Sequence, residues 1–312
     1  MVKTLASVLC ALLCAPAVAR AQSYESIGIR AQGVAGAFVA VADDATAVWW
    51  NPAGLPTSQS FVDGIVEAGR GGQWGVAAGF PALGLSYYHL NISEIQPSGS
   101  TAASSSGRQD PGVAGTGLPG PSIGFNQFGA TVGQSLGDHV VVGTTVKLMN
   151  ALSDTRGDFD LGVMTSFGRF RAGLNVRNLV SGTFGTASQG TVGGGEQLRL
   201  TRQARAGVAA TLPSGGRLDL LTVSMDVDLT TGPAEGREER HVASGAEAWL
   251  PGHRVAFRGG VWANVVTDAG TAAYGSAGVS VSPFRRCFVD AAAMWGPTGD
   301  RDRWGIDLRV TF

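Results

Sequence analysis

The sequence has little charge and few of the residues that enzymes commonly use as catalytic groups. Charged residues make up 15% of the 312 residues, the formal net charge is −1, and there are 4 histidines. This balance gives no reason to expect a nucleic-acid partner. No two histidines have the spacing of metal ligands, and no Gly-x-Ser-x-Gly motif occurs. We therefore expect no enzymatic activity, no metal and no cofactor; a Ser–His hydrolase using His89 or His241 is the alternative.

Cysteine is too scarce for a disulfide framework. The chain has 3 cysteines, two of which lie within residues 1–21. That segment has a basic residue near its start, a short apolar core and small residues up to Ala21, which is typical of a cleaved secretory signal peptide. Cleavage after Ala21 leaves Cys287 alone, so no internal disulfide can form. The alternative is a hydrophobic helix that stays attached to the exported chain.

Long apolar runs are missing after the N-terminus, whereas glycine is abundant. No later segment approaches the ~20 apolar residues of a membrane-spanning helix. Glycine accounts for 47 residues without a strict three-residue period, which excludes collagen, and 44% hydrophobic residues exclude a disordered chain. Low charge, much glycine and scattered apolar residues are compatible with a membrane β-barrel.

Short segments that alternate apolar and polar residues follow one another from about residue 60 to the end. The clearest are 217–230 and 301–312. The fourteen predicted strands are 60–69, 72–80, 82–91, 122–134, 139–150, 157–167, 169–178, 200–212, 217–230, 240–250, 253–264, 271–281, 285–295 and 301–312. Every second connection is short, from the turn at Pro81 to the last at Ser282–Phe284, whereas several of the others are long. Outer-membrane barrels show this alternation of short periplasmic turns and longer outer loops.

The pattern predicts an all-β fold, a transmembrane antiparallel β-barrel of about fourteen strands. A sheet in lipid must close so that every backbone group is paired, and one face then meets hydrocarbon while the other lines the lumen. A soluble β-sandwich is the rival interpretation; the export signal, the strand number and the terminal aromatic favour the membrane. That aromatic, Phe312, resembles the signal read by the barrel assembly machinery. We thus expect an outer-membrane protein of a diderm bacterium, surrounded by outer-membrane lipid.

Charged residues recur on the face opposite the apolar one, and we predict that they line the lumen. They are Lys147, Arg171, Arg177, Arg205, Asp226, Asp228, Glu247, Arg258, Asp290, Asp307 and Arg309. Both signs occur on neighbouring strands, so pairing into a network is favoured over guidance of a solute. Five tryptophans near segment ends are predicted to form an interfacial girdle. These are Trp74, Trp249, Trp262, Trp295 and Trp304.

Residues 22–59 differ from the rest of the chain. The small, apolar run 33–42 could be helical, and Pro52 disfavours helix at Asn51, so the chain should turn there. The domain organisation that we predict is a signal peptide (1–21), an N-terminal hatch or plug (22–59) and a transmembrane barrel (60–312).

The segment from Arg30 to Ala47, followed by Asn51–Leu55, resembles the N-terminus of the FadL-like outer-membrane proteins. That family includes long-chain fatty-acid and aromatic-hydrocarbon channels and a PorV-like branch, which residues 158–162 and 171–179 also resemble. The resemblance implies a fourteen-stranded barrel with an N-terminal hatch in the lumen. The implied hatch or gate residues are Asp43, Asp44, Trp49, Trp50, Asn51, Pro52, Ala53 and Gly54. A static plug that fills the barrel is the alternative to a moving gate.

The resemblance implies passive uptake or binding of a small hydrophobic or amphiphilic compound through the plugged lumen. The sequence departs from the fatty-acid transporters in its compactness, its polar lumen and the lack of an apolar outer loop. A PorV-like scaffold or shuttle for exported proteins is the second hypothesis.

Overall fold

The computed structural model describes residues 27–57, 61–69, 73–92, 123–184, 198–213, 218–234, 237–266, 273–297 and 303–312. The predicted signal peptide, residues 1–21, lies outside the described residues. No helix within these ranges is long and apolar enough to cross a membrane.

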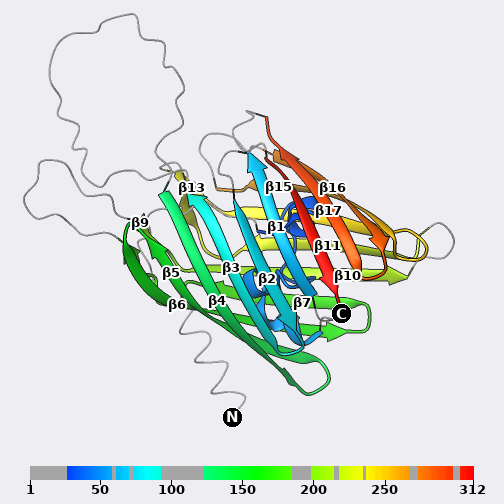
Figure 1. Cartoon of the computed structure of the whole chain (residues 1–312), viewed down its shortest axis with the longest axis horizontal. Coiled ribbons are helices and arrows are strands. Elements are labelled where there is room, and N and C mark those ends of the chain that lie inside the picture. Colours follow the sequence, from blue (N-terminus) through cyan, green and yellow to red (C-terminus); the bar gives the residue numbers. More distant parts are fainter. Residues whose placement is uncertain are drawn as a thin grey trace, which may run out of the picture.

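Fourteen antiparallel strands form the wall of a closed barrel (Figure 1). They are β1 (Phe61–Gly69), β2 (Trp74–Phe80), β3 (Leu83–Ile92), β4 (Ile123–Leu136), β5 (Val140–Ala151), β6 (Asp154–Phe167), β7 (Phe170–Arg177), β10 (Gln203–Pro213), β11 (Leu220–Asp228), β14 (His241–Trp249), β15 (Val255–Asn264), β16 (Ala273–Phe284), β17 (Cys287–Trp295) and β18 (Arg303–Thr311). Each strand pairs with the next along the wall, and β1 pairs with β18 to close the ring. The predicted all-β barrel is confirmed.

Two connections contain small sheets that the sequence did not predict. β8 (Thr183–Phe184) pairs with β9 (Leu198–Arg199), and β12 (Gly232–Ala234) pairs with β13 (Arg237–Glu239). Both lie in long connections between wall strands, which shows that these outer segments have local structure of their own.

The last short turn lies further along the chain than predicted. Ser282–Phe284 belongs to β16, and the turn is formed by Arg285 and Arg286, the second of which has φ 68°. The pairing of β16 with β17 is irregular between Val281 and Phe284. Pro283 lies in this interval and has no amide to donate to the ladder, which accounts for the irregularity.

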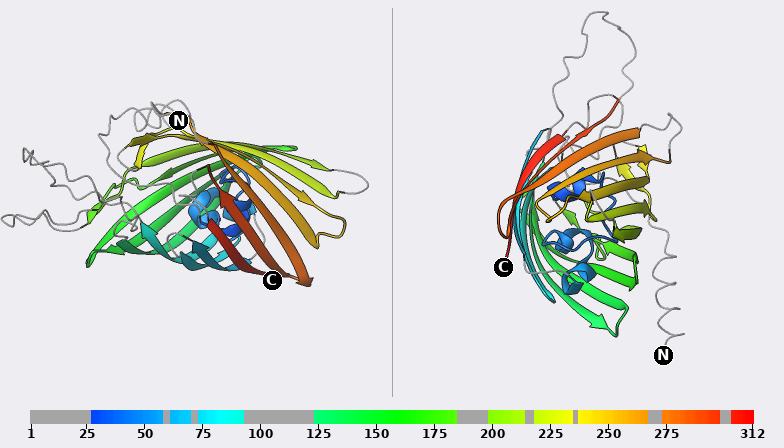
Figure 2. Two further views of the ribbon diagram at one scale, coloured as in Figure 1. Left: turned by 90° about the horizontal axis from the view of Figure 1, so that it is seen from above. Right: turned by 90° about the vertical axis from the view of Figure 1, so that its right-hand side faces the viewer.

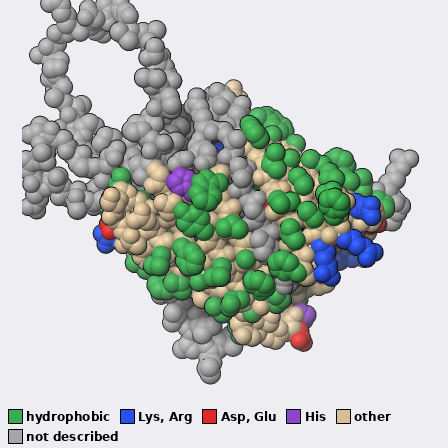
Figure 3. All heavy atoms as spheres, viewed as in Figure 1, with side chains coloured by type: hydrophobic (Ala, Val, Ile, Leu, Met, Phe, Trp, Pro, Cys, Tyr) green, Lys and Arg blue, Asp and Glu red, His purple; other side chains and the backbone are tan. Residues whose placement is uncertain are grey.

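Side chains on the wall strands alternate between the lumen and the outside. On β5, Lys147 and Met149 are buried, whereas Val146 and Leu148 are 46% and 56% exposed. Apolar side chains cover much of the wall in Figure 3. Alternation over antiparallel strands gives the barrel an apolar outer face that suits hydrocarbon.

Three of the five tryptophans predicted to form an interfacial girdle face outward, and two do not. Trp74, Trp295 and Trp304 are exposed on the outer face. Trp249 is buried, shares the inward phase of Glu247 on β14, and donates an indole N–H to its carboxylate at 3.0 Å. Trp262 shares the inward phase of β15 and stacks on Tyr274 with ring centroids 4.1 Å apart. A tryptophan can reach lipid only if it lies at an outward-facing position of its strand, whatever its distance from the strand end.

Residues 27–57, which we call the plug, lie inside the barrel (Figure 2). The plug contains α2 (Ile29–Gly33), α3 (Ala47–Trp50) and the 3-10 helix η1 (Pro52–Thr57). The expected helix over 33–42 is wrong, because α2 ends at Gly33 and the chain continues through turns in which Ala35 and Gly36 have φ of 57° and 78°. The expected turn at Asn51 is confirmed, since α3 ends at Trp50 and Asn51 is extended.

Candidate functional site: the contact between plug and wall

Glycines on the inner face of the wall let the plug backbone approach closely. A β-carbon on Gly173 would lie 2.7 Å from the carbonyl oxygen of Val39, and one on Gly245 would lie 2.5 Å from that of Val34. On β15, a β-carbon on Gly260 would lie 2.5 Å from the carbonyl carbon of Val34. The sequence analysis used the glycine content only as an indicator of a membrane barrel and missed this role. Glycines at inward-facing positions of the predicted strands were the pattern that could have indicated it.

Polar side chains of the wall pair with the irregular part of the plug. Asp226 Oδ2 accepts hydrogen bonds from the backbone N–H groups of Phe38 and Val39 at 2.8 and 2.9 Å. Ser224, also on β11, donates its hydroxyl to the carbonyl of Ala37 at 2.7 Å. These three bonds satisfy backbone groups that a helix over this segment would have paired internally. They explain why the segment is stable without being helical.

The side chain of Asn51 joins two segments of the plug to each other and to the wall. Its amide nitrogen donates to the carbonyl of Val39 at 2.9 Å and to that of Val163 on β6 at 3.2 Å. Its amide oxygen accepts from the N–H of Ala53 at 3.1 Å. Pro52, Ala53 and Gly54 are all buried. Of the predicted hatch residues, Asn51, Pro52 and Ala53 therefore lie against β6.

A cluster of buried charges connects the plug to the wall on the other side. Arg30 on α2 donates from Nε and Nη2 to the two carboxylate oxygens of Glu247, each at 2.8 Å. Its Nη1 contacts Asp43 and lies 3.2 Å from Asp44. Burial lowers the pKa of Arg30, but the carboxylates of Asp43 and Glu247 outweigh it and keep that pKa well above its usual value. Arg30 thus stays charged inside the barrel.

The cluster continues along the wall through ion pairs between neighbouring strands. Arg258 lies opposite Glu247 in the β14–β15 register and donates to it at 2.6 Å. Arg258 also reaches Asp290 at 3.0 Å, and Arg309 reaches the same carboxylate at 3.2 Å. Asp307 is buried opposite Asp290 in the β17–β18 register. This arrangement places two buried carboxylates side by side between two arginines.

A second set of charges lies toward β5, β6 and β7. Lys147 is fully buried and pairs with Asp160 at 2.7 Å, and Arg177 lies 3.8 Å from the same carboxylate. Arg171 lies 3.6 Å from Asp43 of the plug, whose side chain is about a third exposed. All the charges predicted to line the lumen lie at inward positions, and their functional role stays a prediction.

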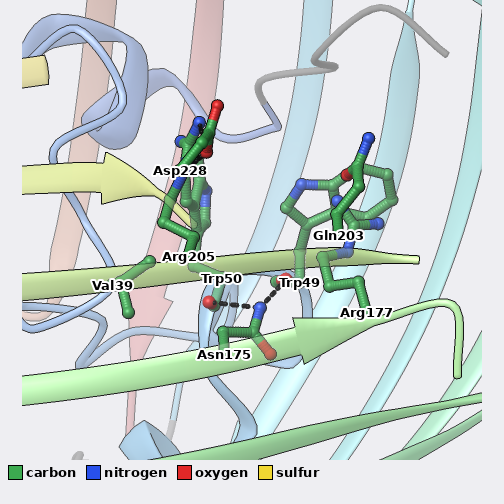
Figure 4. Close-up of a pocket in the computed structure, with 8 residues that line it drawn as sticks. All are labelled: Val39, Trp49, Trp50, Asn175, Arg177, Gln203, Arg205 and Asp228. Carbon is green, nitrogen blue, oxygen red and sulfur yellow. Dashed lines mark hydrogen bonds and ion pairs between the residues drawn. The ribbon is translucent and has the colours of Figure 1, made fainter. Parts of the chain in front are cut away.

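A small cavity lies where the indoles of the plug meet the charged wall (Figure 4). It is lined by Val39, Trp49, Trp50, Asn175, Arg177, Gln203, Arg205 and Asp228. The guanidinium of Arg177 lies 3.6 Å from the ring centroid of Trp49, and Asn175 donates to the carbonyl of Trp50 at 2.7 Å. The cavity has a volume of about 20 Å³, room for about one water molecule. A larger solute does not fit here unless the plug or the wall moves.

Phe312 lies at the end of the wall that carries the short turns. Its side chain is 58% exposed and its ring stacks on Phe80 with centroids 6.2 Å apart. Recognition of this residue by the assembly machinery stays a prediction.

Comparison with solved structures matches this plugged barrel to outer-membrane channels. A FadL homologue from Pseudomonas aeruginosa aligns with a TM-score of 0.58 and 11% identity, over 93% of this chain and 99% of that one. The toluene transporter TbuX from Ralstonia pickettii aligns with a TM-score of 0.57 and 13% identity, over 92% and 99%. The chain has the FadL-like outer-membrane barrel fold.

The monoaromatic hydrocarbon channel CymD also matches this FadL-like barrel, with a TM-score of 0.57 and 11% identity over 92% and 98% of the two chains. A family model described as "F plasmid transfer operon, TraF, protein" matches residues 149–228. A comparison with curated proteins found no match. The likeness to solved structures therefore carries the fold assignment.

Proposed function

We propose that this FadL-like barrel binds small hydrophobic or amphiphilic compounds and lets them cross the outer membrane. The observation that carries the proposal is the cavity between plug and wall, where Trp49 and Trp50 face Arg177 and Arg205. Solved structures of the same fold include a FadL homologue, a monoaromatic hydrocarbon channel and a toluene transporter. This likeness supports a hydrophobic solute for this chain.

The chemistry of the cavity suits a compound with an apolar body and one polar end. Indole rings offer a flat apolar surface, and an arginine fork can bind a carboxylate with two hydrogen bonds. In the closed structure the guanidinium of Arg177 covers the ring of Trp49. A small aromatic acid could replace this internal contact by stacking on the indole while its carboxylate takes the guanidinium. Neutral aromatic compounds would use the indoles alone.

Passage beside Trp49 requires the plug to move, because the cavity there has room for about one water molecule. The plug contacts the wall through ion pairs and glycine positions rather than through covalent links. A shift of the plug relative to β7 and β10 would open a path beside Trp49. The solute then moves down its own concentration gradient, with no cofactor and no energy input at the barrel.

Uptake by vesicles tests the proposal. The purified barrel is reconstituted, and a panel of toluene, benzoate and a medium-chain fatty acid is added outside. Faster entry of at least one compound than into protein-free vesicles, together with quenching of tryptophan fluorescence, is expected. Equal entry rates for the whole panel and unchanged fluorescence would contradict the proposal.

A second candidate function is a scaffold or shuttle that binds exported proteins at its outer segments. It is favoured by the close contact of the plug backbone with the wall at Gly173, Gly245 and Gly260. Recovery of a partner protein with the tagged barrel from native membranes, absent when the β12–β13 segment is deleted, is the expected result. Recovery of the barrel alone would remove this candidate.

We also propose that residues 1–21 are removed on export to the outer membrane. Mass spectrometry of the protein from membranes should give an N-terminus at Gln22. A chain that still begins at Met1 would contradict this cleavage.

A further inference from the structure

Three exposed arginines lie together at one end of the barrel wall. Arg285 and Arg286 form the turn between β16 and β17, and Arg254 lies in the turn between β14 and β15. The amide of Ser282 donates to the carbonyl of Arg254 at 2.7 Å, which brings the two turns side by side. In Figure 3, Lys and Arg side chains gather at one end of the visible wall. We call Arg254, Arg285 and Arg286 the arginine rim.

The arginine rim has no carboxylate partner among the described residues. The lumen arginines differ, since Arg30, Arg205 and Arg258 each pair with at least one carboxylate. The carboxylate in a neighbouring short turn, Asp219, lies 3.7 Å from His253 instead. Three unpaired guanidinium groups on adjacent turns create a local excess of positive charge that attracts an anion.

The arginine rim begins where the apolar outer band ends. Val281 and Val289 face outward with 44% and 39% exposure, and Phe284, next to Arg285, is 75% exposed. Aromatic side chains at the end of an apolar band lie at the level of lipid headgroups. The guanidinium groups beyond Phe284 therefore lie at the level of the headgroup phosphates.

The rim faces the periplasmic leaflet. Both ends of the wall, Phe61 and Thr311, pair at the end that carries the short turns. Outer-membrane barrels have their short turns on the periplasmic side. A guanidinium fork matches the geometry of a phosphate group. We propose that Arg254, Arg285 and Arg286 bind the headgroup of an anionic phospholipid in that leaflet, independently of what passes through the lumen.

A fluorophore attached to Cys287 tests the proposal locally. Cys287 follows Arg286 and is partly exposed at the start of β17. The protein is reconstituted into phosphatidylcholine–phosphatidylglycerol vesicles in which a quencher is carried by one lipid or the other. Quenching by phosphatidylglycerol is expected to exceed quenching by phosphatidylcholine, and the excess should shrink as salt is added.

Variants without the charges of the arginine rim are compared with the unaltered protein. Each basic residue near an anionic surface contributes about fivefold to binding, so the triple variant R254Q/R285Q/R286Q should lose the phosphatidylglycerol preference, a loss of at least tenfold. The matched control R169Q removes a single arginine from the β6–β7 turn, and R285K/R286K keeps the charge. Both should retain most of the preference. Heat-modifiable migration on gels shows that each variant is folded.

Three results would overturn the proposal. One is a triple variant, folded, with the phosphatidylglycerol preference of the unaltered protein. Another is equal quenching by both lipids in the unaltered protein, which would mean that the rim does not select an anionic headgroup. A preference that disappears equally in R169Q would also count against it, since total charge rather than the rim would then be responsible.

Discussion

Arg30 of the plug and Glu247 of the wall form a two-point ion pair, in which Nε and Nη2 of the guanidinium donate to different carboxylate oxygens, each at 2.8 Å. The two residues are 217 positions apart in the sequence. Both side chains are largely buried, so the pair is shielded from water and salt. This contact ties the plug to the part of the wall formed by β14 and β15.

Glu247→Gln should loosen the plug without opening the wall. Removing one partner of a buried ion pair costs about 3 kcal/mol, because Arg30 and Arg258 keep their charges while a shared carboxylate is lost. Hydrogen exchange of the plug amides should therefore accelerate about a hundredfold, while exchange in β5 and β6 stays unchanged. The measurement is hydrogen–deuterium exchange followed by mass spectrometry.

Arg156→Gln is the control for this loss of charge. Arg156 pairs with Asp154 at 2.7 Å, but both side chains are substantially exposed, so the pair contributes less than about 1 kcal/mol. Exchange in the plug should match that of the unaltered protein. Equal acceleration in both variants would contradict the role of the buried pair.

Two neighbouring glycines on β15 should differ in their tolerance of alanine. A β-carbon on Gly260 would collide with the plug backbone at Val34, whereas one on Gly259 meets no atom closer than 3.9 Å. Gly260→Ala should destabilise plug docking by about 2 kcal/mol, and Gly259→Ala should change stability by less than about 0.5 kcal/mol. Protease cleavage of the plug in the folded barrel measures the difference. Equal resistance of the two variants would show that the close approach is not needed.

Asp226 should stabilise the plug as a hydrogen-bond acceptor rather than through its charge. In Asp226→Ala the N–H of Val39 loses its acceptor, at a cost of about 1–3 kcal/mol, and that of Phe38 keeps only the carbonyl of Gly36. Asp226→Asn retains an amide oxygen that can accept, so its effect should be smaller. Amide exchange at Phe38 and Val39 reports the difference directly. An asparagine variant as labile as the alanine variant would assign the effect to charge instead.

Arg177 should distinguish acidic from neutral aromatic solutes. Loss of a hydrogen bond to a charged group costs about 1.5–3 kcal/mol, so Arg177→Gln should weaken benzoate binding about tenfold or more. Toluene, which has no carboxylate, should bind within about twofold of the unaltered protein. Titrations followed by tryptophan fluorescence provide both values. A parallel loss for the two compounds would indicate disruption of the cavity rather than loss of a specific contact.

The wall could be predicted from the sequence because lipid and lumen impose opposite demands on alternate residues. On β5, for example, Val146 and Leu148 face outward on either side of buried Lys147. Ion pairs such as that of Lys147 with Asp160 can be predicted because both residues lie at inward-facing positions on neighbouring strands. The number of strands and the charged inner face could therefore be predicted from the sequence.

The path of the plug could not be predicted in the same way. The segment after Gly33 has the composition of a helix, but its conformation depends on Asp226 and on wall glycines far away in the sequence. Trp249 was misplaced because its position near a strand end was given more weight than its phase. Contacts between distant segments, rather than local preference, determine these features.

A reversible cross-link between plug and wall tests the central claim, that the plug closes the lumen and must move for a solute to pass. A β-carbon at Gly79 would lie 3.5 Å from the Cβ of Ala45, which is within about the range of a disulfide. The variant A45C/G79C, made with C287S, is reconstituted and its toluene uptake is measured before and after reduction, with each single-cysteine variant as control. The account predicts no uptake above protein-free vesicles in the oxidised state and recovery on reduction. Equal uptake in both states, with the disulfide verified by mass spectrometry, would contradict it.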